Sequence, residues 1–297
     1  MNEFDFINQI TKSLKKQGGA IYRGVGDDSA ALKIAALKGK FLLVSNDDLY
    51  ENRHFLANFP PRGVGYKLIA ANASDIFASG GEPKFANLSA AISPAINEGW
   101  AAELFLGALE ACAEFGIEII GGNTARAETS HFGAAILGAA NRFVSRGGAK
   151  IGDDLWLTAP LGKSAIGLKA LLSGDLTSEI ALSHLYPKLP IKLSPLIARF
   201  ASAAIDISDG FLGDAGHLIA ASGVGFEARD PALIVANGAD LEIALNSGEE
   251  YQILFTAPVK YRAKFEAAGA IKIGAATLEK SLAIGGKIYE TKGFTHF

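Results

Sequence analysis

Short apolar runs alternate along the chain with stretches of helical spacing, and polar residues gather where the runs end. The apolar runs predict buried strands at 41–44, 85–92, 116–120 and 131–140 in the first half, and at 155–158, 204–207, 251–256 and 271–273 in the second. Helical spacing and stop signals predict helices at 3–16, 63–79, 98–115, 164–172, 195–203 and 211–221. Alternating strands and helices are typical of an α/β or layered α+β fold.

A polar, glycine-rich connection from Arg146 to Asp153 divides the chain into two halves. A length of 297 residues suits two domains of about 150 residues each. We therefore predict an N-terminal domain over residues 1–145 and a C-terminal domain over residues 146–297.

Composition narrows the classes of function. The formal net charge is −3 and no run of Lys and Arg exceeds two residues, which argues against nucleic acid or an anionic membrane as a partner. Cys112 is the only cysteine, so a disulfide framework and a thiolate metal site are excluded. The N-terminus lacks signal-peptide features, and no apolar run approaches the ~20 residues of a membrane span. We expect a cytoplasmic protein whose partners are small molecules or proteins.

Six oxygen-rich segments recur, most of them at the ends of apolar elements. They are Gly26-Asp27-Asp28, Ser45-Asn46-Asp47-Asp48, Ser74-Asp75, Gly121-Gly122-Asn123-Thr124, Asp206-Ile207-Ser208-Asp209 and Gly248-Glu249-Glu250. A solvated turn explains most of them singly, because Asn and Asp form turns readily. Asp75 is harder to explain, since an unpaired carboxylate is costly in an Ala-rich helical stretch. If the segments converge, their hard oxygen atoms predict a cluster of Mg²⁺ ions that neutralises a polyphosphate.

Two nucleotide-binding signatures are missing from the sequence. Leu161-Gly162-Lys163-Ser164 ends like a P-loop, but Leu157 stands where the P-loop requires its first glycine. No Gly-x-Gly-x-x-Gly segment follows a strand and opens a helix, so Rossmann and protein-kinase fingerprints are lacking. The double glycine Gly121-Gly122, placed directly after a predicted strand, would let backbone N–H groups approach a phosphate closely.

The order and spacing of these segments resemble the thiamine-monophosphate kinases, a family of the aminoimidazole-ribonucleotide-synthetase-like ATP-binding superfamily. The resemblance runs from Gly26-Asp27-Asp28 to Gly293-Phe294-Thr295-His296-Phe297. It implies a two-domain fold, in which an N-terminal sheet domain pairs in a homodimer and a C-terminal α/β domain closes over the nucleotide. It also implies ATP-dependent phosphorylation of thiamine monophosphate to thiamine diphosphate, assisted by several Mg²⁺ ions.

The resemblance assigns residues by position in the motifs. The implied metal ligands are Asp27, Ser45, Asn46, Asp47, Asp75, Asn123, Asp206 and Asp209. The implied nucleotide contacts are Phe105, Gly122, Asn123, Arg146 and Ser208, and the implied substrate contacts are His54, Glu249 and Phe294. Asn46 stands where the family usually has Thr, Asn123 where it usually has Asp, and Glu250 where it usually has Asp. The missing charge at Asn123 bears on the affinity of one metal site.

The mechanism that we expect is direct in-line transfer, with Asp47 and Asp75 as bridging metal ligands and Arg146 as a phosphate clamp. A phosphate oxygen of the acceptor is already anionic near neutral pH, so the reaction needs no strong general base. Positioning and charge neutralisation then supply most of the rate.

Two alternatives stay open at this point. One is another enzyme of the superfamily, such as a purine-pathway synthetase or a selenophosphate synthetase, although no Cys accompanies the N-terminal motifs and the C-terminal Gly-Phe-Thr-His-Phe fits the thiamine enzyme better. The other is a nucleotide or metal sensor, which would bind ATP with Mg²⁺ yet form no product. Without the resemblance, His54 is best interpreted as a loop histidine that caps a neighbouring carbonyl.

Overall fold

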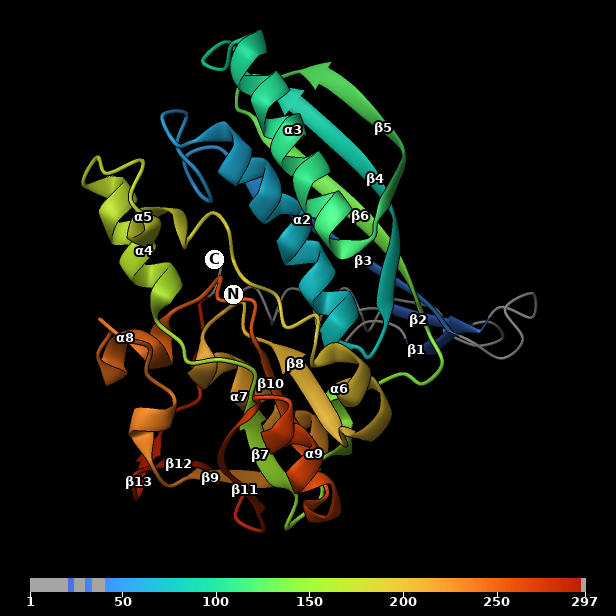
Figure 1. Cartoon of the computed structure of the whole chain (residues 1–297), viewed down its shortest axis with the longest axis vertical. Helices are drawn as coiled ribbons and strands as arrows, with labels where there is room; N and C mark the ends of the chain where they lie inside the picture. The colour runs from blue at the N-terminus through green and yellow to red at the C-terminus, as the bar shows by residue number, and fades with distance from the viewer. Residues whose placement is uncertain (1–20, 24–29, 34–40, 295–297) are drawn as a thin grey trace.

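The computed structural model describes residues 21–23, 30–33 and 41–294, which form two β-sheets with helices packed around them (Figure 1). The strands are β1 (Ile21–Arg23), β2 (Ala30–Lys33), β3 (Phe41–Tyr50), β4 (Glu82–Ile92), β5 (Glu118–Arg126), β6 (His131–Ala140), β7 (Asp154–Leu157), β8 (Ala203–Asp206), β9 (Gly225–Ala228), β10 (Ile253–Ala257), β11 (Ile271–Thr277), β12 (Leu282–Ile284) and β13 (Lys287–Tyr289). The helices are α2 (Pro61–Ala78), α3 (Glu98–Phe115), α4 (Lys163–Leu172), α5 (Glu179–Leu182), α6 (Ser194–Phe200), α7 (Phe211–Ser222), α8 (Leu241–Asn246) and α9 (Arg262–Ala267), with 3₁₀ turns η2 (Arg146–Gly148), η3 (Pro231–Leu233) and η4 (Val259–Tyr261). This mixed architecture confirms the predicted fold class.

The first sheet has the strand order β1-β2-β3-β6-β4-β5. β4 and β5 run parallel and are joined by α3, whereas the other neighbouring strands are antiparallel. Parallel neighbours need such a crossover, because the chain must return to the starting end of the sheet before the second strand begins, and a tight turn cannot span that distance. Figure 1 shows α2 and α3 side by side on one face of this sheet.

The two helices approach closely because each has a glycine at the crossing. A Cβ on Gly65 of α2 would lie 1.8 Å from the Leu104 carbonyl oxygen, and one on Gly107 of α3 would lie 1.9 Å from the Arg62 carbonyl oxygen. Both atoms belong to the backbone and cannot rotate away. The glycines therefore fix how near α2 lies to α3, and with it how deeply α2 sits in the molecule.

α2 is buried on nearly all sides, since 15 of its 18 residues are buried. A helix that packs on one layer shows a single apolar stripe, whereas a helix buried all round lies between layers. Here the second layer is the second half of the chain, since α2 also contacts β8 and α6. The polar residues of α2 must therefore find partners inside the protein.

The second sheet has the order β13-β12-β9-β11-β7-β10-β8. Every residue of β7, β8 and β10 is buried, which agrees with their nearly continuous apolar sequences and with cover on both faces. Trp156 on β7 and Phe255 on β10 stack with ring centroids 6.1 Å apart and belong to the same apolar core as the first half. The two halves thus share buried surface.

Most of the predicted elements are present in the described residues. α3 covers Glu98–Phe115 as predicted, because Asn97 caps its start by accepting a hydrogen bond from the Trp100 N–H and Gly116 ends it with φ of 70°. The predicted helix at 3–16 lies outside the described residues. β9, β12, β13 and the short helices α5, α8 and α9 were not predicted.

Two strands are longer than predicted, and this changes where the polar segments lie. The prediction that a strand ends at Val44 is wrong: β3 continues to Tyr50, because β6 pairs with it from Phe41 to Tyr50. β5 likewise contains Gly121 and Gly122, which the sequence placed after the strand. A Cβ on Gly122 would lie 2.5 Å from the Leu88 carbonyl oxygen. The absence of a side chain at Gly122 therefore lets β5 lie close to β4 at this position.

The chain passes from the first sheet to the second between Ala140 and Asp154, the interval that contains the predicted boundary. The division into domains 1–145 and 146–297 stays a prediction.

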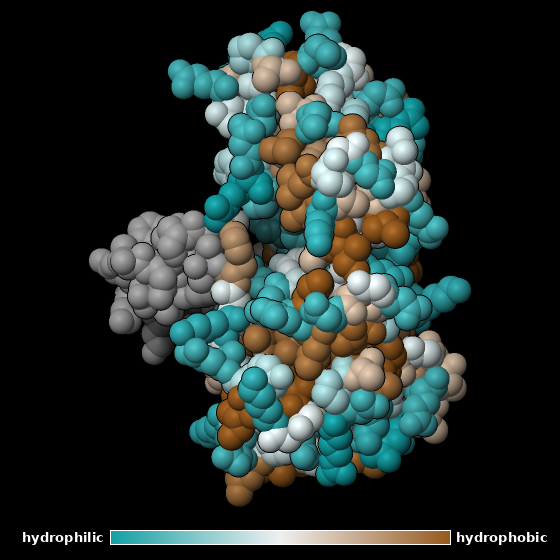
Figure 2. Space-filling view, turned by 90° about the vertical axis from the view of Figure 1, so that its left-hand side faces the viewer, coloured by the Kyte–Doolittle hydropathy of each residue, from teal (hydrophilic) through white to brown (hydrophobic). Residues whose placement is uncertain are grey.

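In the space-filling view the surface is hollowed where the upper and lower halves meet (Figure 2). Among the described helices, none combines the length and the hydropathy that crossing a bilayer requires.

Candidate active site

α2 holds the polar segment of β3 from one side. The Ser45 hydroxyl donates to the Asp75 carboxylate, and Asn72 bonds to both backbone groups of Asp47, accepting from its N–H at 2.7 Å and donating to its carbonyl at 3.2 Å. The odd-numbered side chains of this part of β3 therefore face α2. Asp47 and Asp75 consequently lie on the same side of the first sheet, as their predicted shared role requires.

The second half adds its own carboxylate to this place. Ser74, the residue before Asp75, donates to the carboxylate of Asp206 at the end of β8. Tyr251 lies next to the cluster, and its pKa is raised well above the ordinary value by burial and then by the charges of Glu249, Asp47, Asp206 and Asp75. Four carboxylates from both halves of the chain therefore converge around one buried phenol.

Such a cluster is electrostatically unfavourable unless cations neutralise it, because like charges at short range disfavour each other's ionisation. Its donor atoms are carboxylate and hydroxyl oxygens from Ser45, Asp47, Asp75 and Asp206. Hard oxygen ligands of this kind suit Mg²⁺. The residues present therefore fit the metal that the sequence predicted.

A second group lies at the start of α7. One ligand atom from each of Asp209, Asp214 and His217 falls within 4.8 Å of the others, and the Asp209 N–H donates to Asp214 at 3.2 Å. Burial and the nearby Arg146 guanidinium lower the pKa of His217, which places Arg146 beside this group. Sequence reasoning missed Asp214 and His217, although their spacing of three residues on a helix directly after Asp209 was a usable signal.

The three predicted substrate contacts come together from distant segments. His54 accepts a hydrogen bond from the Tyr50 N–H at Nδ1, at 3.0 Å, and lies close enough to Glu249 to contribute to the lowering of its pKa. The Arg53 guanidinium lies 5.0 Å from the centre of the Phe294 ring. The Phe294 N–H donates to the Asp209 carbonyl at 3.1 Å, so the aromatic residue is held at the end of the Asp206–Asp209 segment.

The loop before β10 turns sharply at Glu249. The Glu249 N–H donates to the Ser208 carbonyl at 2.8 Å, which ties this loop to the Asp206–Asp209 segment. Glu249 and Tyr251 both have positive φ, 56° and 51°, a conformation that is costly for residues with a side chain. Strained backbone of this kind is concentrated at functional sites, and here it orients Glu249 between the two halves.

Glu250 has a different role from its neighbour. Its carboxylate accepts from the backbone N–H groups of Gly162 and Ser164, at 2.8 and 3.0 Å, and from the Ser247 hydroxyl. It therefore satisfies the free N–H groups at the start of α4. Burial raises its pKa above the ordinary value despite these bonds.

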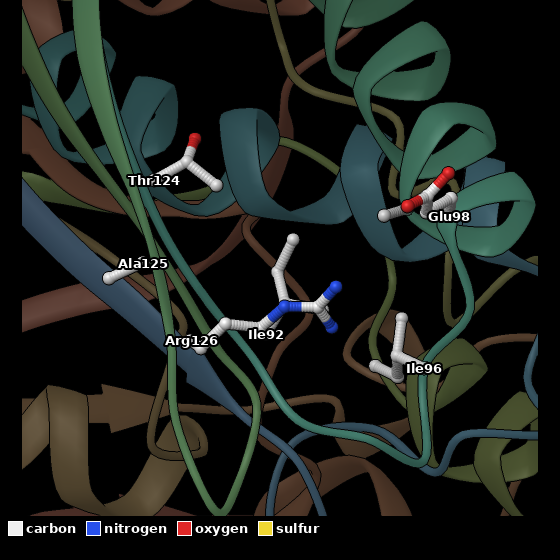
Figure 3. Close-up of a pocket in the computed structure, with 7 residues that line it drawn as sticks. Ile92, Ile96, Glu98, Thr124, Ala125 and Arg126 are labelled. Atoms are coloured by element: carbon white, nitrogen blue, oxygen red, sulfur yellow. The ribbon is translucent and has the colours of Figure 1, made fainter.

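The predicted nucleotide contacts on α3 and β5 share a cavity of about 300 Å³. Phe105, Gly122 and Asn123 line it together with apolar side chains of both elements. A neighbouring cavity of about 350 Å³ shares Thr124 with it, and there Arg126 reaches from β5 across the space toward the start of α3, where Glu98 lies (Figure 3). Arg126 is a cation near the predicted nucleotide contacts that the sequence did not single out.

Two predicted metal ligands, Asn46 and Asn123, lie away from the acidic cluster in the part of the chain that the structure describes. Strand alternation places Asn46 on the face of β3 opposite to Asp47. Asn123 lies on β5, separated from β3 by β6 and β4, which corresponds to about 14 Å at the usual strand spacing. Asp27 lies outside the described residues. Their roles as ligands stay predictions.

Comparisons with known proteins show the family of the chain. Residues 26–140 match the family described as AIR synthase related protein, N-terminal domain. Thiamine-monophosphate kinase from Aquifex aeolicus (strain VF5) is 33% identical to the chain over 312 aligned positions, which cover 100% of this chain and 98% of that protein. The thiamine-monophosphate kinase of Buchnera aphidicola subsp. Schizaphis graminum (strain Sg) is 31% identical, with 100% and 99% covered.

The solved structure of AaThiL complexed with AMPPCP and TMP superposes with a TM-score of 0.91 at 33% sequence identity, covering 100% of this chain and 97% of that chain. Sequence and structure are therefore related over both halves, and no part of the chain is left outside the relationship. The chain belongs to the thiamine-monophosphate kinase family.

Proposed function

We propose that this protein transfers the γ-phosphoryl group of ATP to thiamine monophosphate, which yields ADP and thiamine diphosphate. The observation that carries the proposal is the convergence of Asp47, Asp75 and Asp206 at the junction of the two halves, beside Glu249. Charge stabilisation by bound cations is the main requirement of phosphoryl transfer, and this junction supplies the ligands.

Mg²⁺ is the metal that we propose for this cluster. Ser45, Asp47, Asp75, Asp206 and Asp209 would hold it. The roles of Asp27, Asn46 and Asn123 as further ligands stay predictions from the sequence. Bound Mg²⁺ neutralises phosphate oxygens and supports the charge that develops during transfer.

The residues of the chain position the two reactants. His54, Glu249 and Phe294 would bind and orient the thiamine end of the acceptor, while Arg146, near Asp209, would bind phosphate. The acceptor phosphate is already anionic near neutral pH, so no side chain is needed to remove a proton. In-line positioning is then the contribution of the protein.

The donor nucleotide would place its base end in the cavity lined by Phe105, Gly122 and Asn123. Ser208, between Asp206 and Asp209, would contact its phosphates.

We also propose that two copies of the chain pair through the first sheet. β5 is an edge strand with every residue exposed, and the apolar Phe85, Ile119 and Ile120 are exposed on β4 and β5. Light scattering measures the oligomeric state in solution, and a monomer at micromolar concentration would contradict the proposed dimer.

A phosphoryl-transfer assay tests the function. ATP, Mg²⁺ and thiamine monophosphate are mixed with the protein, ADP and thiamine diphosphate are followed together, and free thiamine serves as the control acceptor. Equal formation of both products from the monophosphate alone is the expected result. Binding of ATP without product would instead identify a nucleotide sensor.

Two variants connect the activity to the cluster. Asp47→Asn and Asp75→Asn should each lower kcat by about 10²-fold or more and raise the Mg²⁺ concentration needed for half-maximal rate. Asp48→Asn is the matched control, because Asp48 lies on the other face of β3 with its carboxylate 3.1 Å from His131. If Asp47→Asn and Asp75→Asn leave turnover and its Mg²⁺ dependence unaltered, the assignment of the cluster is wrong.

A further inference from the structure

Lys67 on α2 is a buried cation, with a side chain that is 1% exposed. Its ammonium group lies 2.5 Å from a carboxylate oxygen of Glu249, 2.9 Å from Nε2 of His184 and 3.5 Å from the backbone carbonyl oxygen of His54. These partners come from three segments far apart in the sequence. Two of them, Glu249 and His54, are the polar residues expected to contact the substrate.

A buried ammonium group is costly unless it is paired and hydrogen-bonded. At this point of α2 the surrounding helix is apolar and buried, so an apolar residue would pack there without that cost. The charge is therefore not explained by packing. It is explained by the three oxygen and nitrogen acceptors that surround it.

His184 acts in this group as a neutral acceptor. Burial and the charge of Lys67 lower its pKa to about 3, so the ring is uncharged at neutral pH. Because Lys67 donates to Nε2, the proton of the ring is on Nδ1, which faces the Ser164 hydroxyl at 2.9 Å. His184 thereby fixes the direction of the ammonium group without competing for the carboxylate.

Glu249 is held from two directions. Burial opposes its ionisation, but the charge of the Lys67 ammonium and its hydrogen bond to the carboxylate lower the pKa of Glu249 below the ordinary value, so the carboxylate is ionised. Its backbone N–H donates to the Ser208 carbonyl, and the residue adopts a positive φ of 56°. The side chain remains 26% exposed, which leaves it accessible to a ligand while Lys67 fixes its orientation.

We propose that Lys67 is a positioning residue for the acceptor substrate. It sets the spacing between the Glu249 carboxylate of the second half and the His54 loop of the first half, so that both can meet the thiamine end of the acceptor. This inference rests on the proposed function. It assigns Lys67 to acceptor recognition, not to the ATP and Mg²⁺ side, whose residues lie farther along α2.

The test compares Lys67→Met with the wild type. Methionine keeps the unbranched apolar stem and removes the charge, which leaves Glu249 without its cation. The expected result is a rise of about tenfold or more in KM for thiamine monophosphate, with KM for ATP and kcat each changed by less than about threefold. Lys169→Met, at an exposed position of α4, is the matched control and should change none of these values.

A purely structural role would give a different pattern. If Lys67 only joined the two halves, both KM values would rise in parallel with a loss of stability in urea, and this result would overturn the proposal, as would unchanged KM values. Lys67→Arg retains the charge but changes its distances to Glu249, His184 and His54. It should therefore raise KM for thiamine monophosphate without raising KM for ATP, by a smaller factor than Lys67→Met. If Lys67→Met does not fold, Lys67→Arg distinguishes the positioning role from the structural role.

Failure of the proposed function can be recognised separately. If the wild type forms no thiamine diphosphate, calorimetric binding of thiamine monophosphate and of free thiamine to the wild type and to Lys67→Met still tests the positioning role. Weaker binding of both ligands by the variant would support it. Equal binding, or no binding to the wild type, would overturn it.

Discussion

Replacing Asn72 by Ala should weaken both the fold and the metal cluster. β6 pairs with β3 along its whole length on one side, but β2 pairs with it on the other side only from Phe41 to Val44. At Asp47 the side chain of Asn72 takes the place of a neighbouring strand, because its amide bonds both the N–H and the carbonyl of that residue. The Asn72 side chain is fully buried, so it reaches these backbone groups from inside the protein.

The magnitude follows from the bonds that are lost. Asn72→Ala removes two hydrogen bonds to Asp47 and a third, at 2.9 Å, to the Leu68 carbonyl. A hydrogen bond contributes about 1 kcal/mol net, and backbone groups of the exposed Asp47 can recover part of this from water. The free energy of unfolding should therefore fall by about 2 to 3 kcal/mol. The Mg²⁺ concentration for half-maximal rate should rise severalfold, since Asp47 loses its anchor.

Urea unfolding followed by tryptophan fluorescence measures the first effect, with Trp156 in the shared core as a reporter. The Mg²⁺ titration of the kinase assay measures the second. Arg62→Ala on the same helix is the control, since its ion pairs with Glu103 and Glu110 are exposed and contribute little. An Asn72→Ala protein within about 0.5 kcal/mol of the wild type, with an unchanged Mg²⁺ titration, would refute the reasoning.

Two further predictions concern the helix crossing and the buried histidine. Gly107→Ala should lower the free energy of unfolding by about 1 to 3 kcal/mol, because its Cβ would lie 1.9 Å from a carbonyl oxygen of α2; Gly99→Ala, earlier in α3, would bring its Cβ no closer than 3.3 Å, to the Asn97 side-chain oxygen, and should be close to neutral in urea unfolding. His184 binds a proton when unfolded below pH ~6.5 but not when folded, since its folded pKa is about 3. Stability should therefore decrease as pH falls from about 7 to 5, by at most about 1.4 kcal/mol per pH unit from this group, and urea unfolding of His184→Gln should show a flatter pH dependence.

The sequence predicts elements well where the signals are local. α3 is the clearest case, because an Asn cap, an apolar pattern and a terminal glycine all lie within the helix or beside it. The family resemblance, carried by motifs spread over the whole chain, is likewise supported by relatives that match over the full length. In both cases the information is contained in neighbouring residues or in their order.

The extent of β3 could not be predicted in the same way. Ser45-Asn46-Asp47-Asp48 has the composition of a turn, yet it continues as a strand because β6, some 90 residues later, offers a full set of partners. The consequence for the site is direct. In a turn all four side chains could face one ion, whereas in a strand Asn46 and Asp47 point to opposite faces.

Lys67 shows a different limit of sequence reasoning. A lysine among Ala, Leu and Ile in a helix is compatible with an exposed position, and its spacing in the sequence does not reveal that His184 lies 117 residues away in the chain and 2.9 Å away in space. The burial of α2 on all sides is a property of two layers meeting, which a single helical pattern does not encode. Contacts between such distant residues can be identified only from the three-dimensional arrangement of both halves.

The same burial makes α2 the connection between the parts of the site. Its polar contacts run toward the first sheet and toward the second half, through the pairs Lys67–Glu249, Asn72–Asp47, Ser74–Asp206 and Asp75–Ser45. Two of these pairs cross between the halves, Lys67–Glu249 on the proposed acceptor side and Ser74–Asp206 on the proposed metal side. A change in the angle between the halves would therefore alter both crossing pairs together. Because one rigid helix carries them, closing of the halves around a ligand at either end is expected to set the geometry of the other.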